Sequence, residues 1–211
     1  RELLICMDRL FTLFRQHFGR DHKYVRPLTG SASNRQYFRL SDDETSCVGV
    51  LGVNPDENRT FIAMAAHFRA QGIAVPEVYA VSEDSVAYIQ EDLGDTALFG
   101  IVGSEGSEEL LCRTVRCLPD IQFKGADGFD FSVCHSVCRF DRRLVLFDLN
   151  YFKYCFLKPS GLEFDENRLQ DDFERLADDL TSVKTDTFMY RDFNARNVMI
   201  KDGAPCFIDF Q

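Results

Sequence analysis

Apolar positions along the chain change their period several times, and each change predicts a different element. Residues 2–18 carry apolar side chains at helical spacing, at Leu3, Met7, Leu10, Phe14 and Phe18. This spacing predicts an amphipathic helix that ends at Gly19. The runs 24–28, 37–40 and 47–53 are rich in β-branched and aromatic residues and are separated by the polar segments TGSASNRQ and SDDET. They predict three strands in an antiparallel meander.

A second helix is predicted after the third strand. Asn54 suits an N-cap, Pro55 the first helical position, and Glu57 stands three residues after the cap, so a helix should run through FIAMAAHFRAQ to Gly72. The strand VAYIQ then leads into EDLGD. Acidic residues and glycine there indicate a linker between lobes, with the boundary near Asp92.

The second half of the chain reads as mostly helical. The segments SEELLCRTVRCL and RRLVLFDLNYFKYCFL both predict helices, and the second is apolar on most sides, which predicts that it is buried. A further amphipathic helix is marked by Leu169, Phe173, Leu176 and Leu180. The short runs VMI and CFI, joined by KDGAP, predict a hairpin that turns at Asp202 and Gly203.

Composition narrows the class of protein. The 211 residues are 45% hydrophobic with a net charge of −10, which predicts a globular protein and disfavours nucleic acid or an anionic membrane as partner. The eight cysteines contain no C-x-x-C pair, and the nearest approach to a ligand cluster, Cys134, His135 and Cys138, lacks the usual zinc spacing. We expect reduced cysteines and, since we see no secretory signal or membrane-spanning run, a cytoplasmic protein.

The closing hairpin carries candidate chemistry. If its turn centres on Gly203, residues whose numbers sum to 406 face one another, and Asn197 lies opposite Asp209. Opposing Cβ atoms in such a pair are about 4.5–5.5 Å apart. An amide oxygen and a carboxylate at that separation can bind one Mg²⁺ ion. Asp192, on the loop leading into the hairpin, is then placed to contact a substrate hydroxyl near the metal-bound phosphate.

These residues resemble two protein-kinase motifs. Tyr190-Arg191-Asp192 followed by Asn197 is similar to H-R-D-x-x-x-x-N, and Asp209-Phe210-Gln211 is similar to D-F-G. The resemblance implies that Asp192 accepts the proton of the substrate hydroxyl, while Asn197 and Asp209 hold Mg²⁺. Tyr190 replaces a histidine that is mainly structural in kinases, so the change is compatible with activity.

Nearly the whole chain resembles the aminoglycoside phosphotransferase and choline kinase family. The segments LTGSASNRQYFRL, GIAVPEVYA, QEDLGD and RDFNARNVMI…FIDFQ are most similar to bacterial anomeric sugar kinases that phosphorylate N-acetylmuramate or N-acetylglucosamine at C1. The resemblance implies an α+β, protein-kinase-like fold with a small antiparallel-sheet N-lobe, residues 1–91, and a mostly helical C-lobe, residues 92–211. In the relatives the D-F motif is followed by further helices, so we expect a truncated C-lobe and an incomplete acceptor site.

The same resemblance implies ATP as phosphoryl donor. The loop TGSASNRQ would cover the phosphates, and the backbone of residues 90–93 would hydrogen-bond the adenine. The residues concerned are Gly30, Ser31, Ala32, Ser33, Asn34, Gln90, Glu91, Asp92 and Leu93. The alternatives are an ordinary hairpin turn and a simple interlobe loop.

The strand CVGVLGV lacks the lysine that kinases place there. Arg35 and Arg39 are the nearest basic residues, but isolated charges are usually exposed, so we favour solvated strand residues.

The acceptor side is less marked. Asp148, Asn150 and Arg196 could reach a sugar hydroxyl or acetamido group, although Asp148 could instead cap or pair within a buried helix. Together these features predict an ATP- and Mg²⁺-dependent kinase of a small hydroxylated molecule, an amino sugar at its anomeric position. The alternatives are an aminoglycoside or choline-type kinase, and a nucleotide-binding module that has lost catalysis, as the missing strand lysine and missing C-terminal portion suggest.

Overall fold

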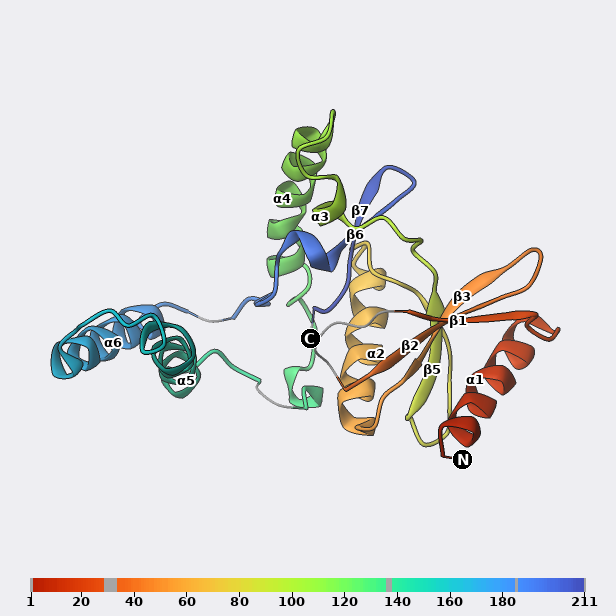
Figure 1. Ribbon diagram of the computed structural model, residues 1–211, viewed down its shortest axis with the longest axis horizontal. Coiled ribbons are helices and arrows are strands. Elements are labelled where there is room, and N and C mark those ends of the chain that lie inside the picture. Colours follow the sequence, from red (N-terminus) through yellow and green to blue (C-terminus); the bar gives the residue numbers. More distant parts are fainter. Residues whose placement is uncertain (1, 29–33, 136–137, 185, 211) are drawn as a thin grey trace. The chain divides into compact units, whose positions relative to one another are not determined.

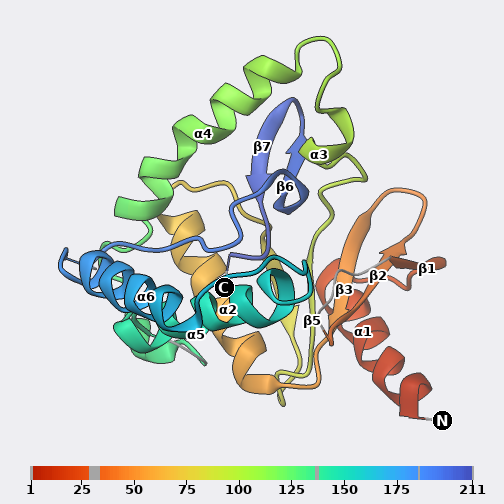
Figure 2. The same cartoon turned by 60° about the vertical axis from the view of Figure 1, so that its left-hand side comes forward.

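The structure is a computed structural model that describes residues 2–28, 34–135, 138–184 and 186–210. Contacts divide the chain into two units: a larger one, Arg1–Ser136 with Tyr190–Gln211, and a smaller one, Val137–Met189. The larger unit combines an antiparallel sheet with helices and the smaller unit is helical (Figures 1 and 2), which confirms the α+β class. A lobe boundary near Asp92 stays a prediction.

A five-stranded antiparallel sheet forms the centre of the larger unit. Its strands, in the spatial order β1-β2-β3-β5-β4, are β1 Tyr24–Leu28, β2 Gln36–Ser41, β3 Ser46–Leu51, β5 Ala87–Glu91 and β4 Val78–Val81. The predicted meander β1-β2-β3 is confirmed. Strand β4 was not predicted, because four residues are too few to show a clear alternation.

Helices α1, Glu2–Phe18, and α2, Pro55–Ala70, lie on opposite faces of this sheet (Figure 1). On the α1 face, Leu10 packs in one cluster with Ile89, while on the α2 face Phe61 stacks on Tyr88, with ring centroids 5.5 Å apart. Adjacent strand residues thus serve opposite faces. Gly49 allows the close approach of α1, since a Cβ there would lie 2.9 Å from a Leu10 methyl group.

The predicted start of α2 is confirmed. The Asn54 side chain accepts from the backbone N–H groups of Asp56 and Glu57, at 3.1 and 3.4 Å, and therefore satisfies donors that have no partner inside the helix. This cap matters for the site because it fixes the first turn, which carries Glu57 and Asn58.

The closing segment is attached to the rest of the larger unit. After α3 (Leu98–Ile101), α4 (Ser107–Phe123) and the short η1 (Phe131–Val133), the chain returns as η3 (Ala195–Asn197), β6 (Val198–Lys201) and β7 (Ala204–Phe207). The N–H of Phe207 donates to the carbonyl of Ala74 at 2.8 Å. The buried Phe210 ring packs against Phe61 and Phe68 of α2, with centroids 5.2 and 5.1 Å away. The end of the hairpin is thereby anchored to α2.

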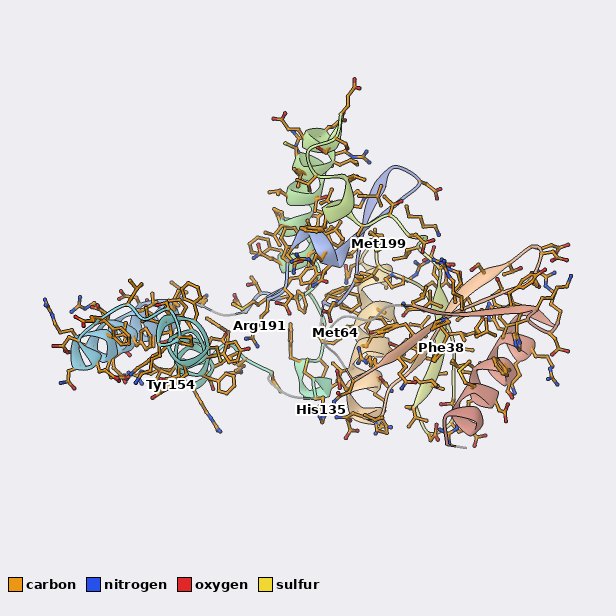
Figure 3. All side chains as sticks on the ribbon, viewed as in Figure 1. Phe38, Met64, His135, Tyr154, Arg191 and Met199 are labelled. Carbon is orange, nitrogen blue, oxygen red and sulfur yellow. The ribbon has the colours of Figure 1, made fainter. Side chains whose placement is uncertain are left out.

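The smaller unit contains α5 (Arg142–Phe152), the π-helical η2 (Lys153–Leu157) and α6 (Glu166–Thr181). The helix predicted over 142–157 is present, but the prediction that it is buried is wrong. Val145 and Lys153 are buried, but most aromatic side chains are exposed: Phe147, Tyr151, Phe152, Tyr154 (labelled in Figure 3) and Phe156. Apolar composition says that a helix can be buried, but burial also requires a covering element, and among the described elements α5 packs mainly against α6. No helix within the described ranges has the length and apolarity to span a bilayer.

Candidate active site

The closing hairpin turns where the sequence predicts, but its register differs. Asp202 and Gly203 both have positive φ, 50° and 73°, as a two-residue type I′ turn requires. Paired residues from Val198↔Phe207 to Lys201↔Ala204 have numbers that sum to 405, not 406. Asn197 therefore faces Ile208, whose N–H donates to the Asn197 carbonyl at 3.0 Å. The predicted Asn197–Asp209 pairing across the ladder is wrong, because the turn is centred between Asp202 and Gly203.

Asp209 leaves the strand conformation altogether. Its φ of 56° lies in the left-handed region, which is uncommon for a residue with a side chain and concentrates at functional sites. The ladder therefore does not set the direction of its carboxylate. The conformation is held from both sides, since Ile208 bonds back to Asn197 and Phe210 is buried against α2.

The Tyr190 hydroxyl connects the loop that carries Asp192 to the end of the hairpin. It donates to the carbonyl of Ile208 and also lies 3.2 Å from the carbonyl of Asn197. Desolvation, and then the negative charges of Asp209 and Asp192, raise the pKa of Tyr190, so the phenol keeps its proton and remains a donor. Tyr190 thus has a structural role here, as the resemblance implies for a residue at this position.

The loop itself is closed by side-chain bonds to the Asp192 backbone. The Asp192 carbonyl accepts from the side-chain amides of Asn194, at 2.9 Å, and Asn197, at 3.0 Å. These bonds occupy the backbone of Asp192, while the residue itself is exposed. An exposed carboxylate on a backbone held in this way can contact a small molecule.

Charges gather around Asp209. Its pKa is raised, first by desolvation and then by the negative charge of Asp192; the Arg35 guanidinium acts in the opposite direction, and Glu57 adds a smaller increase. Asp209 still has solvent access, so its hydration is reduced rather than lost. The fold has therefore brought the two carboxylates of the closing segment close to Arg35 and Glu57, which come from the first third of the sequence.

The residues present fit a magnesium ion. Mg²⁺ prefers hard oxygen ligands and usually keeps several from water and substrate phosphates. Asp209 offers a carboxylate, and because Asn197 Nδ2 is used by the Asp192 carbonyl, the Asn197 side chain presents Oδ1 on its other arm. Within the described ranges, no group of three or more His, Cys, Asp or Glu side chains could hold a metal, so phosphate oxygens would have to complete the shell.

Both arginines are held in ion pairs, Arg35 with a buried side chain and Arg39 with a largely buried one, so the expectation of solvated strand residues is wrong. The Arg39 guanidinium forms a two-bond contact with Asp92, at 2.6 and 2.8 Å, and reaches Asp95 at 2.7 Å. The Arg35 side chain is 7% exposed and lies 3.4 Å from Glu57. Their partners come from distant segments, so the local pattern could not reveal them. Glu57 was recognised only as a helix-start residue; its spacing from Arg35 carries no signal of the pairing.

The predicted nucleotide residues are only partly described. Gly30, Ser31, Ala32 and Ser33 lie outside the described residues, and Asn34 is exposed. In the linker, Asp92 binds Arg39 and Ser46 and accepts from the N–H of Gly94, so its carboxylate is committed within the fold. The carboxylate of Glu91 is likewise engaged by Lys201. Gln90 and Leu93 are buried, and Gln90 Oε1 has no partner among the described residues. Contact with adenine through this backbone stays a prediction.

The predicted acceptor residues belong to different elements. Arg196 stacks over the Phe99 ring, with its guanidinium carbon 4.2 Å from the centroid. Asn150, on α5 of the smaller unit, donates to the carbonyl of Leu146 at 2.8 Å. Asp148, on the same helix, is half-buried. Their role toward an acceptor stays a prediction.

Comparison with known proteins places this geometry in context. The model of the phosphotransferase enzyme family matches residues 25–211. Two curated relatives are named N-acetylmuramate/N-acetylglucosamine kinase: one from Pseudomonas aeruginosa, 25% identical, and one from Neisseria meningitidis serogroup B, 27% identical. The matches cover 88% and 85% of this chain but 54% of each relative. The chain thus spans about half the length of these relatives.

Solved structures share the fold at low identity. The crystal structure of the aminoglycoside phosphotransferase APH(4)-Ia matches with a TM-score of 0.61 and 14% identity over 98% of this chain and 71% of that one. A putative fructosamine-3-kinase from Haemophilus somnus matches with a TM-score of 0.57 and 12% identity, over 95% and 70%. Spectinomycin phosphotransferase APH(9)-Ia, solved with ADP and spectinomycin, gives 0.54 and 15%, over 97% and 68%.

Proposed function

The chain belongs to the phosphotransferase enzyme family, and from this premise we propose that the protein transfers a phosphoryl group from ATP, with Mg²⁺, to a hydroxyl of a small molecule. The observation that carries the proposal is the coupling of Asp192 and Asp209. The two carboxylates come from either side of the hairpin, and the Tyr190 hydroxyl joins the loop that carries Asp192 to the end of the hairpin. The negative charge of Asp192 helps to raise the pKa of Asp209, and the Arg35 guanidinium opposes this. Two nearby carboxylates with different surroundings suit the roles of base and metal ligand.

The proposed reaction is an in-line displacement. The acceptor oxygen forms a bond to the γ-phosphorus of ATP as the bond to the β-γ bridging oxygen breaks, and ADP leaves. Asp192 accepts the proton of the attacking hydroxyl and later returns it to solvent. Asn197 and Asp209 would hold the Mg²⁺ ion, which when bound neutralises charge on the phosphate oxygens. Positioning and charge neutralisation supply most catalysis of this reaction, so few reactive side chains are needed.

The proposed acceptor is an amino sugar phosphorylated at its anomeric hydroxyl. This choice is supported by the names of the two curated relatives, N-acetylmuramate/N-acetylglucosamine kinase. The alternative is an aminoglycoside or choline-type acceptor. Two observations favour it: the fold shared with APH(4)-Ia, and the net charge of −10, which suits a cationic acceptor. Coupled detection of ADP release by the full-length protein, with N-acetylmuramate, N-acetylglucosamine, aminoglycosides and choline as acceptors, separates these classes. Release of ADP only with a cationic acceptor would overturn the amino-sugar proposal.

Two substitutions test the assigned roles. Asp192→Asn should lower kcat by at least about 10²-fold with little change in the KM for ATP, because it removes only the base. Asp209→Asn should weaken ATP binding in the presence of Mg²⁺ much more than in EDTA, because it removes charge from the metal shell. Asp202→Asn is the matched control: it removes the same charge from the same hairpin, and asparagine suits the positive φ of this turn.

Three results would contradict the proposed roles or the proposed activity. Near-native kcat for Asp192→Asn in an active wild type means that Asp192 is not the base. Equal loss of ATP affinity with and without Mg²⁺ for Asp209→Asn argues against the metal role. Mg²⁺-dependent ATP binding without transfer to any acceptor would favour a nucleotide-binding module.

A further inference from the structure

Arg35 is a buried cation whose position calls for a function. It stands directly before β2, at the end of the segment expected to cover the nucleotide phosphates, and its side chain is only 7% exposed. Burying a guanidinium is costly unless it is paired and hydrogen-bonded. Its neighbours therefore show what the fold gains by holding it there.

The neighbours of Arg35 come from the first turns of α2. Arg35 Nε donates to Asn58 Oδ1 at 3.2 Å, and Nη2 lies 3.4 Å from Glu57 Oε1. The guanidinium carbon also sits 5.8 Å from the centroid of the Phe61 ring. Contacts with three residues of one helix fix both the position and the plane of the guanidinium.

Asn58 is itself held rigidly. It is completely buried, and its Nδ2 donates to the carbonyls of Gly52, at 3.1 Å, and Ser85, at 2.8 Å. The Asn58 amide is thereby oriented with Oδ1 toward Arg35. Arg35 is thus positioned by a residue that is buried and satisfied on its other side, which is how a binding group is preorganised.

The guanidinium also lies beside the end of the hairpin, because the Phe61 ring below it stacks on Phe210, the residue that follows Asp209, with centroids 5.2 Å apart. Arg35 is therefore close to the carboxylate that we propose as a magnesium ligand. Other candidates on the sheet are committed elsewhere: Arg39 binds Asp92 and Asp95, and β3, all of whose residues are described, contains no lysine.

We infer that Arg35 is the cationic residue that binds the phosphate groups of the nucleotide, held in place by Glu57 and Asn58. The inference rests on the proposed function and names a binding residue for it. A guanidinium carries five N–H donors in a planar fork, so it can keep its contacts with α2 and still donate to phosphate oxygens. It would supply here, from the start of β2, the charge that kinases place on the third strand.

The test compares ligands with and without phosphates. Binding of ATP, ADP and adenosine to the full-length protein is measured by titration calorimetry, each in Mg²⁺ and in EDTA. Arg35→Gln should weaken ATP and ADP binding about 10- to 100-fold, as expected for loss of a charge-assisted contact, and change adenosine binding less than about 2-fold. The loss should persist in EDTA, because the guanidinium contacts phosphate directly. Arg26→Gln, which removes an exposed arginine of β1, is the matched control and should leave all three affinities unchanged.

The variants also separate this inference from the proposed function. Wild type that binds no nucleotide would refute both. Wild type that binds ATP while Arg35→Gln binds ATP, ADP and adenosine as tightly, or loses all three alike, would refute the role of Arg35 alone. A loss seen only with Mg²⁺ would mean that Arg35 acts through Asp209, which also refutes direct contact. If Arg35→Gln does not fold, Arg35→Met removes the charge and keeps the length of the apolar stem, and an unchanged ratio of ATP to adenosine affinity in that variant overturns the inference.

Discussion

Replacing Tyr190 by phenylalanine removes one oxygen atom from the candidate site and keeps the ring. The ring still packs edge-on against Phe193 and Phe207, with centroids 5.5 and 6.3 Å away. What disappears is the donor that reaches the carbonyls of Ile208 and Asn197. The Asn197 carbonyl keeps its bond from the Ile208 N–H, so the main loss is at the Ile208 carbonyl.

The expected loss of stability follows from the hydrogen bond removed at the Ile208 carbonyl. Losing one net hydrogen bond while leaving a partly buried carbonyl without its donor costs about 1–2 kcal/mol. We expect this loss in the free energy of unfolding from urea titration followed by circular dichroism, since the chain has no tryptophan for fluorescence. Amide exchange of Ile208 should also accelerate, because its N–H bond to Asn197 spans the segments that the hydroxyl holds together. Tyr24→Phe, at an exposed strand position, is the matched control and should cost less than about 0.5 kcal/mol.

Either of two results would show that the Tyr190 hydroxyl does not hold the loop to the hairpin. Tyr190→Phe could be as stable as Tyr24→Phe, which would mean that the buried hydroxyl contributes nothing. Alternatively, stability could fall while exchange at Ile208 is unchanged, which would place the effect away from the junction of loop and hairpin.

Two further predictions concern ion pairs. In a double-mutant cycle with Arg39→Gln and Asp92→Asn, unfolding titrations should give a coupling energy of about 1–2 kcal/mol, more than for an exposed pair because both side chains are largely buried; a value near zero would contradict this. In the smaller unit, hydrogen bonds from Lys153 and Lys158 lower the pKa of Glu166 from 4.5 to about 2. The folded pKa is the lower one, so this stabilisation is present above about pH 4.5 and lost as the pH falls toward 2. Thermal melts across that range should show a shallower decline for Glu166→Gln, and parallel declines would contradict the assignment.

Local patterns in the sequence determined most of the elements. The 3.6-residue period of Leu10 and Phe14 predicts α1, and Asn54 with Pro55 predicts the start of α2, because caps and periodicity depend on neighbours within one or two turns. The Asp202-Gly203 turn was predictable for the same reason, since few residues adopt positive φ at low cost. The order of these elements and the D-x-x-x-x-N and D-F motifs were also enough to indicate the family.

The tertiary structure decided what depends on distant partners. The hairpin register shifted by one residue because a two-residue turn sets the pairing, and Asp209 then left the strand with a left-handed backbone. The aromatic residues of α5 are exposed. The sequence could not predict this, because composition does not specify which element packs on a helix. Arg35 is buried and Arg39 is largely buried because carboxylates from far along the chain meet them. Sequence spacing carries no record of such pairings, since an ion pair requires only that two side chains meet in space; the electrostatics around Asp192 and Asp209 are therefore a property of the fold.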